Sequence, residues 1–254
     1  MNSGLSLIVI TLNEEQNLRR CLESVKGVAD EIIIVDSGSK DKTLEIAAEF
    51  SARIYRKEWM GYSRQKNFGN DLASFNMILS LDADEALSDE LRRSILYEKA
   101  KGWKGVYSFA RITNYCGVFI KHGGWYPDFK VRIFNRTLVK WVGEIHEVLS
   151  GYNSNEVNVL KGDCLHYSYY NSEQHWKQAE KFSNLAAEDL FKRGKKYSFI
   201  KIFMAPIFRF ISGYFFNLGI LDGVSGLKIA YISAAATKIK YVKLRQLWRN
   251  NGKS

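Results

Sequence analysis

The chain has few cysteines, and their placement excludes several classes of protein. Among its 254 residues there are three cysteines, Cys21, Cys116 and Cys164, an odd number placed far apart. A disulfide framework needs pairs, and a zinc or redox site needs closely spaced residues, so neither is predicted. We therefore expect a reduced protein on the cytosolic side.

The beginning of the chain lacks a long apolar run. The run Leu5–Ile10 is too short for a signal peptide or a membrane span, and the polar residues Asn13, Glu14 and Glu15 follow it closely. No internal repeat or low-complexity linker is visible. With 46% hydrophobic and 25% charged residues, the chain is expected to be globular, with length for one large domain and an appendage.

Acidic residues are almost absent from the last quarter of the chain. From Lys192 to Ser254 there are 13 lysines and arginines and one acid, Asp222, whereas the rest of the chain has 24 basic and 26 acidic residues. The net charge of +10 therefore belongs to the C-terminal region. This distribution argues against a nucleic-acid partner and favours a basic appendage that meets an anionic surface.

The glycine-rich phosphate-binding motifs are missing too. No G-x-G-x-x-G follows the first predicted strand and no G-x-x-x-x-G-K-[ST] occurs, so dinucleotide-binding and P-loop enzymes are disfavoured. Apolar and amphipathic runs nevertheless alternate as in an α/β protein, which predicts an open, mostly parallel sheet with helices on both faces. Strands are predicted at 5–10, 31–36, 52–55 and 77–81, and helices at 14–25, 43–50, 61–72 and 90–100.

Polar residues follow three of the predicted strands. The clusters are Thr11 with Asn13 and Glu14, Asp36 with Ser37 and Ser39, and Asp82 with Asp84. Ligands of such sheets bind at the carboxyl ends of the strands. Two carboxylates at the end of a buried strand need a cation, and hard divalent cations share oxygen ligands with substrate phosphates. We therefore predict a metal–diphosphate site, against the alternative of an acidic turn and a helix cap.

The three motifs, in this order and spacing, resemble those of family-2 glycosyltransferases with the GT-A fold. They are Asn13-Glu14, the turn Val35–Thr43 and the segment Leu81–Asp84, and the resemblance covers about the first 170 residues. It implies an α/β GT-A catalytic domain over residues 1–170, followed by a basic helical region over residues 171–254. Within the family, the chain looks most similar to lipopolysaccharide-core glycosyltransferases.

The resemblance implies a nucleotide diphosphate sugar donor, most often linked to UDP. Asp36 would accept a hydrogen bond from the base, and Thr11 and Glu14 would line the nucleoside pocket. The alternatives are a turn carboxylate for Asp36 and helix capping for the other two. Asn13, Ser37 and Ala83 complete the expected donor site.

Two cations, Arg64 and Lys66, precede the aspartate motif on a predicted helix. They would reach the donor phosphates or form a solvated face. The resemblance also implies that Asp82 faces the donor sugars and that Asp84 binds Mg²⁺ or Mn²⁺ directly. His166 would be a further metal ligand. Glu85 would support the metal ligands from behind or, as we favour, lie in the first turn of the next helix.

An inverting transferase needs a carboxylate that takes the proton of the attacking hydroxyl. The candidates are Asp128, Glu144 and Glu147. His146-Glu147 stands where the family places its acidic catalytic motif, although the common pair there is Glu-Asp. We therefore rank Glu147 first and Asp128 second. His146 would orient the acid or the acceptor, or be a core histidine.

The C-terminal region is predicted to be helical from Ser172. Tyr197–Leu221 is long enough to span a bilayer, but Lys201, Pro206 and Arg209 interrupt it. We expect an interfacial helix or kinked pair on an anionic leaflet rather than a span. The alternative is a helical cap that packs on the catalytic domain.

Together these features predict an inverting glycosyltransferase on the cytoplasmic face of the cytoplasmic membrane. It would move a glucose-like hexose to a lipid-linked saccharide such as the lipopolysaccharide inner core. Alternatives are transfer to a polypeptide or a polyprenyl phosphate, and a catalytically silent scaffold that binds glycan or lipid. The presence of Asp36, Asp82 and Asp84 argues against a silent scaffold.

Overall fold

The computed structural model describes residues 4–143 and 147–251. The chain divides into two compact units. The first comprises the residues up to Arg111 and Asp128–Tyr167, and the second comprises Ile112–Pro127 and the residues from Ser168 onward. Residues 112–127 thus group with the C-terminal helices, which differs from the single boundary near residue 170 expected from the sequence.

The first half of the main sheet has the predicted parallel strands. Its order is β3-β2-β1-β4, and every pairing within it is parallel. Helices connect these strands, as parallel pairing requires. The elements are β1 (Leu5–Thr11), α1 (Leu18–Ser24), β2 (Glu31–Asp36), α2 (Thr43–Glu49), β3 (Arg53–Arg56), α3 (Tyr62–Asp71) and β4 (Met77–Asp82).

The second half of the sheet corrects the expectation of a mostly parallel sheet. In the described residues the sheet continues from β4 in the order β8-β6-β11-β5, and the pairs β4–β8, β6–β8 and β5–β11 are antiparallel. Between α4 and α5 the described chain contains no further α-helix, so strands turn back without crossovers. These elements are β5 (Glu85–Leu87), α4 (Asp89–Lys101), β6 (Val106–Tyr115), β7 (Val118–Ile120), β8 (Asp128–Asn135), β9 (Lys140–Val142), β10 (Val148–Ser150), η1 (Ser154–Glu156) and β11 (Val157–Tyr169).

Helices cover both faces of this sheet, as expected for the α/β class. On β1, Leu7 and Val9 face the core shared with α1, α2 and α4, whereas Ile8 faces the core that includes Phe68 of α3. Gly69 brings α3 close to β1, because a Cβ atom there would lie 2.5 Å from a methyl carbon of Ile8. The close packing fixes the position of α3 against β1.

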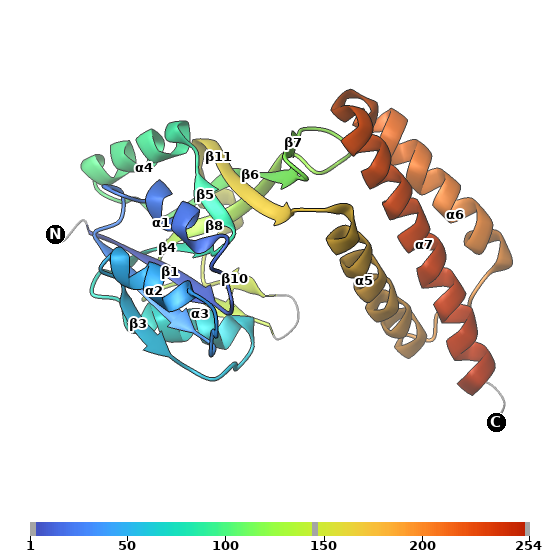
Figure 1. Cartoon of the computed structure of the whole chain (residues 1–254), viewed down its shortest axis with the longest axis horizontal. Coiled ribbons are helices and arrows are strands. Elements are labelled where there is room, and N and C mark those ends of the chain that lie inside the picture. The colour runs from blue at the N-terminus through green and yellow to red at the C-terminus, as the bar shows by residue number, and fades with distance from the viewer. Residues whose placement is uncertain (1–3, 144–146, 252–254) are drawn as a thin grey trace. The chain divides into compact units, whose positions relative to one another are not determined.

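The second unit is built mainly of helices. Figure 1 shows α6 and α7 side by side, with α5 next to α7. Asn171 caps the start of α5, and its side chain and Gln174 form a capping box. The helical elements are α5 (Ser172–Lys192), α6 (Phe199–Ile211), the π-helical turn η2 (Ser212–Phe216), η3 (Gly219–Asp222) and α7 (Gly223–Asn251).

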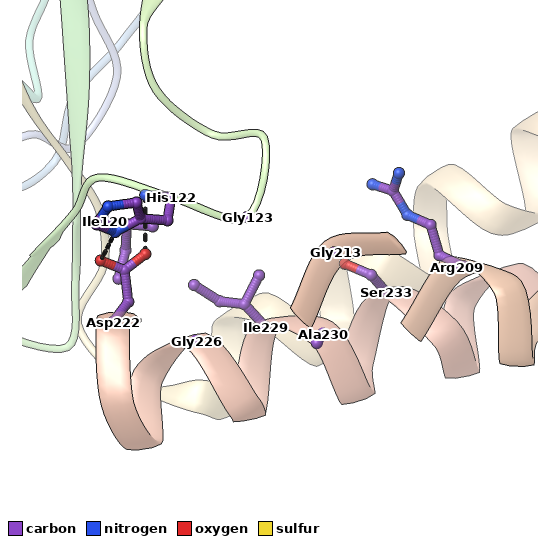
Figure 2. Close-up of a pocket in the computed structure, with 10 residues that line it drawn as sticks. All are labelled: Ile120, His122, Gly123, Arg209, Gly213, Asp222, Gly226, Ile229, Ala230 and Ser233. Carbon is purple, nitrogen blue, oxygen red and sulfur yellow. Dashed lines mark hydrogen bonds and ion pairs between the residues drawn. The ribbon is translucent and has the colours of Figure 1, made fainter. Parts of the chain in front are cut away.

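A loop after β7 is fastened to the start of α7 (Figure 2). The Asp222 carboxylate accepts hydrogen bonds from the backbone amides of Lys121 and His122, at 3.2 and 2.9 Å, and lies 3.0 Å from His122 Nδ1. The Asp222 side chain is 6% exposed. The one acid between Lys192 and Ser254 is therefore used internally and does not offset the surface charge of this stretch.

Candidate donor and catalytic site

The three predicted polar clusters lie at one edge of the sheet. Thr11 on β1 is level with Asp36 on β2, and Ile10 is level with Asp82 on β4. Burial raises the pKa of Glu14, a hydrogen bond from Asn17 opposes this, and the nearby charges of Asp84, Asp41 and Asp82 raise it further. The carboxyl ends of β1, β2 and β4 therefore gather acids in one region.

The carboxylate of Asp36 is fully buried and engaged within its own turn. Its Oδ1 accepts from the amides of Gly38 and Ser39, both at 2.9 Å, and its Oδ2 accepts from the hydroxyls of Thr11, at 3.1 Å, and Ser39. The alternative of a turn carboxylate describes these contacts. Ser37, the next residue, accepts a hydrogen bond from Gln65 of α3 at 3.1 Å.

Asn13 does not cap α1, because that helix starts later than the residue 14 expected from the sequence. The helix begins at Leu18, and Asn13 has a left-handed backbone with φ of 57°. Its amide donates to Ser39 Oγ, and its Oδ1 accepts from the amide of Lys40, both at 2.9 Å. Asparagine tolerates this backbone conformation well. The two hydrogen bonds connect the loop after β1 to the loop after β2. The amide of Glu14 donates to Thr43 Oγ1 at 2.7 Å.

Asp82, the last residue of β4, lies between two cations. Its Oδ1 is 3.0 Å from Lys66 Nζ, and its Oδ2 accepts from Arg132 Nη2 at 2.9 Å. Burial acts to raise the pKa of Asp82, but the charges of Arg132 and Lys66 outweigh it and hold the pKa well below its usual range. Asp82 is therefore a fixed anion, and the buried Ala83 follows it in the turn.

Glu85 lies in β5 and not in a helix, which is a second correction. The helix α4 begins only at Asp89, capped by Ser88. The Glu85 side chain is fully buried; its Oε1 is 2.6 Å from Arg132 and 3.3 Å from Arg111, and its Oε2 accepts from the amide of Asp82 at 3.0 Å. Glu85 therefore fixes the turn that carries Asp82 and Asp84, because it binds the backbone amide of Asp82.

Asp84 and His166 form the candidate metal pair. Asp84 Oδ2 is 3.2 Å from His166 Nε2, and their side chains are 28% and 17% exposed. Two adjacent ligands at about 2.1 Å from one octahedral ion lie about 3.0 Å apart, so the pair fits such an ion. Among the described residues no group of three or more His, Cys, Asp or Glu side chains could hold a metal. A divalent ion here would therefore take further ligands from substrate phosphates and water.

The two cations of α3 differ in environment. Arg64 is exposed, whereas the Lys66 side chain is 2% exposed. Lys66 Nζ lies 3.0 Å from Asp82 Oδ1, 3.3 Å from Glu147 Oε1 and 4.6 Å from the centre of the Trp141 ring. Lys66 is therefore not part of a solvated face, and its contacts go to side chains of the site.

The two described candidates for the catalytic base also differ. Asp128 Oδ2 accepts two bonds from Arg111, at 2.7 and 3.1 Å, and its Oδ1 is 2.9 Å from Lys130 Nζ. Burial opposes the change, but Lys130 and Arg111 lower the pKa of Asp128, which makes it a weaker base. Among the described residues Glu147 contacts one cation, Lys66, and its side chain is 25% exposed. His146 and Glu144 lie outside the described residues.

These contacts join into one run of alternating charges, which we call the charge chain. Its ends are Glu147 and Lys130, and every consecutive pair in it lies within 3.3 Å. Several members line a cleft of about 460 Å³, together with Trp141 and Tyr152. The chain comprises, in order, Glu147, Lys66, Asp82, Arg132, Glu85, Arg111, Asp128 and Lys130.

Sequence reasoning missed Arg132 and Arg111 as members of the site. Arg132 is 5% exposed, and burial opposes its charge while Glu85 and Asp82 raise its pKa above the usual range. Burial likewise opposes the charge of Arg111, and Glu85 and Asp128 help to raise its pKa. The available signal was an arginine inside an apolar strand, since such a residue needs a buried anion.

The sheet, its helices and the acids at its carboxyl edge define an α/β protein with the GT-A fold. The chain belongs to glycosyl transferase family 2, whose model matches residues 6–154. An uncharacterised glycosyltransferase of Rickettsia bellii (strain RML369-C) is 33% identical over 97% of this chain and 88% of that protein.

The chain is also similar to a lipopolysaccharide core glycosyltransferase and to a solved structure. The lipopolysaccharide core biosynthesis glycosyltransferase LpsC of Rhizobium meliloti is 28% identical over 91% of this chain and 90% of its own length. Among solved structures, S. aureus TarS 1-349 is 17% identical, covers 98% of this chain and 92% of its own, and has a TM-score of 0.49.

Proposed function

We propose that the protein is a metal-dependent inverting glycosyltransferase. It moves a glucose-like hexose from a nucleotide diphosphate sugar, linked to UDP, to a lipid-linked saccharide such as the lipopolysaccharide inner core. The observation that carries the proposal is the meeting of the Asp84–His166 pair, Asp82 and Glu147 at one strand edge of a family 2 chain. The likeness to LpsC supports the class of acceptor.

The reaction is a direct displacement at the anomeric carbon of the donor sugar. The acceptor hydroxyl attacks from the face opposite the diphosphate, and Glu147 takes its proton as the new C–O bond forms. The bond from the anomeric carbon to the diphosphate breaks, and its electron pair leaves with the nucleotide. Asp84 and His166 would hold a Mg²⁺ or Mn²⁺ ion, which neutralises charge on the leaving diphosphate.

The donor would lie along the strand ends. The nucleoside would lie at the carboxyl ends of β1 and β2, beside Thr11, Asp36 and Ser37. Asp82 would face the donor sugar. Lys66 is enclosed by its partners, so the exposed Arg64 is the cation of α3 left to reach the phosphates.

The change Asp84→Ala tests the metal site. Transfer from UDP-glucose to extracted membrane glycolipids should require Mg²⁺ or Mn²⁺ and should fall about 10³-fold in this variant, because several kcal/mol of leaving-group stabilisation are lost. Asp89→Ala, which removes an exposed acid at the start of α4, is the matched control and should transfer normally. Normal turnover by Asp84→Ala would exclude this metal site.

We further propose that the second unit binds the surface of an anionic membrane. One side of α6 exposes apolar side chains in pairs four residues apart, whereas Ile202 is buried. A soluble helix turns such a stripe inward. Phe199–Phe216 is long and apolar enough to cross a membrane, with a mean hydropathy of 1.4. The exposed pairs, which we call the apolar face of α6, are Phe199 and Ile200, Phe203 and Met204, and Ile207 and Phe208.

The charge of the region supports the same partner. The Asp222 carboxylate is hydrogen-bonded to the loop after β7 and buried there. The exposed charges of the described residues from Lys192 onward are therefore all positive. Lys201 and Arg209 lie within the apolar segment, which favours an interfacial position over a span. The exposed cations are Lys192, Arg193, Lys195, Lys196, Lys201, Arg209, Lys228, Lys238 and Arg249.

The double variant Phe203→Glu/Ile207→Glu tests this surface. Its binding to phosphatidylglycerol-containing vesicles should fall about 10²-fold, because two apolar side chains no longer enter the leaflet. Phe182→Glu/Leu185→Glu on α5 introduces the same charges at exposed apolar positions outside this face and should bind as the wild type does. Equal loss in both variants would argue against the apolar face of α6 as the binding surface.

A further inference from the structure

Lys66 occupies an enclosed place in the charge chain. Its ammonium is enclosed by Asp82, Glu147 and the Trp141 ring, and its side chain is 2% exposed. Removing an ammonium from its anions inside a protein is costly, so these partners hold it in place. Lys66 therefore connects the carboxylate that faces the donor with the carboxylate that faces the acceptor.

The same helix also holds the backbone that leads to Glu147. The Asn67 side chain donates to the Trp141 carbonyl at 2.8 Å and accepts from the Trp141 amide at 3.0 Å. One turn earlier, Ser63 Oγ donates to the carbonyl of Gly143 at 2.5 Å. Lys66 and Asn67 lie three and four residues after Ser63, so all three share one face of α3. This face fixes β9 and, through Lys66, the Glu147 side chain.

Glu147 differs from the other anions of the charge chain. Asp82, Glu85 and Asp128 each contact two cations, whereas the contacts of Glu147 within the described residues include one, Lys66. An acid with two cations around it is a poor proton acceptor, while one with a single contact keeps an oxygen for the substrate. The arrangement orients Glu147 without consuming it.

We infer that Lys66 is a positioning residue that holds Glu147 in the cleft beside Asp82, so that the base is aligned with the donor sugar. The inference rests on the proposed function, because it assigns Lys66 a part in the same transfer. It replaces the expectation that Lys66 binds the donor phosphates.

The experiment is a double-mutant cycle in the full-length protein with Lys66→Met and Glu147→Gln. Transfer is measured with labelled UDP-glucose and extracted membrane glycolipids, and nucleotide binding is measured by calorimetry with UDP and Mn²⁺. Lys66→Met should lower kcat about 10²-fold, because a misplaced base loses that much. The Kd of UDP should change by less than about threefold, since the nucleotide contacts remain. Lys101→Met, which removes an exposed cation at the end of α4, is the matched control and should leave kcat unchanged.

In the Glu147→Gln background, Lys66→Met should cost less than about threefold in kcat, because the residue acts through Glu147. Additive losses, or a Kd for UDP that rises in parallel with the loss of transfer, would overturn the inference and make Lys66 a donor ligand. Wild-type protein that transfers no sugar would refute the proposed function instead.

Two measurements keep the inference testable in every case. Urea unfolding of the four proteins needs no substrate, and additive midpoint shifts would show that Lys66 and Glu147 are not coupled. If Lys66→Met does not fold, Asn67→Ala loosens β9 without removing a charge. It should lower kcat about tenfold with the Kd of UDP unchanged, and an unchanged kcat would overturn the inference.

Discussion

The two units of the molecule treat charge in opposite ways. In the first unit, the acids and bases of the charge chain are paired with one another, and the side chains of Lys66, Arg132 and Glu85 are 6% exposed or less. In the second unit, from Lys192 onward, most of the described cations are exposed and the one acid, Asp222, is turned inward. Fixed, desolvated charges suit a site that orients reacting groups, and exposed charges of one sign suit a surface that meets an anionic partner.

The largest expected effect sharpens the comparison inside the first unit. Glu147→Gln removes the proton acceptor and should lower kcat for transfer about 10³-fold while UDP binding stays unchanged. Single-turnover transfer and calorimetry measure the two quantities. Asp128→Asn is the companion variant; if it alone abolishes transfer, the ranking of the two acids is reversed.

The pH dependence of stability should separate the two units. Burial lowers the pKa of His175 in the second unit from 6.5 to about 4. Below pH 6.5, His175 therefore binds a proton in the unfolded chain but stays neutral in the folded unit until the pH approaches 4. The free energy of unfolding therefore falls as the pH drops. The loss should be on the order of 2 kcal/mol between pH 7 and pH 5.

The first unit should behave differently over the same range. The cations beside Asp82 and Asp128 hold the pKa of each carboxyl below its usual range despite burial. The two aspartates stabilise the fold fully above their unfolded pKa of about 3.9. This stabilisation is lost only as the pH falls toward their lower pKa in the folded protein. Amide hydrogen exchange at pH 7 and pH 5 compares α5 with β1. An equal loss of protection at pH 5 in α5 and β1 would contradict the difference between the units. So would a His175→Phe variant whose α5 still loses protection at pH 5.

The smallest expected effect concerns a single surface cation. Lys196→Gln should weaken binding to phosphatidylglycerol vesicles about fivefold at low salt, since one cation near such a surface contributes about 1 kcal/mol. The difference should shrink as NaCl is added. Arg93→Gln removes an exposed cation from α4 of the first unit and should leave binding unchanged; equal losses would show that net charge matters and not its location.

The sequence predicted the parallel half of the sheet because three of its four strands are mostly apolar and its helices are regular. It also placed Asp82 and Asp84 at a strand end next to two other polar ends, because parallel strands share one carboxyl edge. The antiparallel half was less visible, since β5 has three residues and adjoins the Ser88 cap. A short strand before a cap has the same composition as a first helical turn, which is why Glu85 was misplaced.

The partners within the site could not be predicted in the same way. Arg111 and Arg132 reach Glu85 from β6 and β8, 26 and 47 residues away. Such pairings depend on strand register, which periodicity within one segment does not specify. Lys66 posed a different problem, because burial of one residue on a polar helix depends on what packs over it, here Trp141 and Glu147.

The apolar face of α6 has a practical consequence for handling the protein. In a buffer without lipid or detergent, the six exposed side chains of this face have only water or another copy of the chain to contact. Purified samples should therefore grow in mean particle mass as they are concentrated, and mild detergent should return them to a uniform species. Light scattering with and without detergent would follow this behaviour directly.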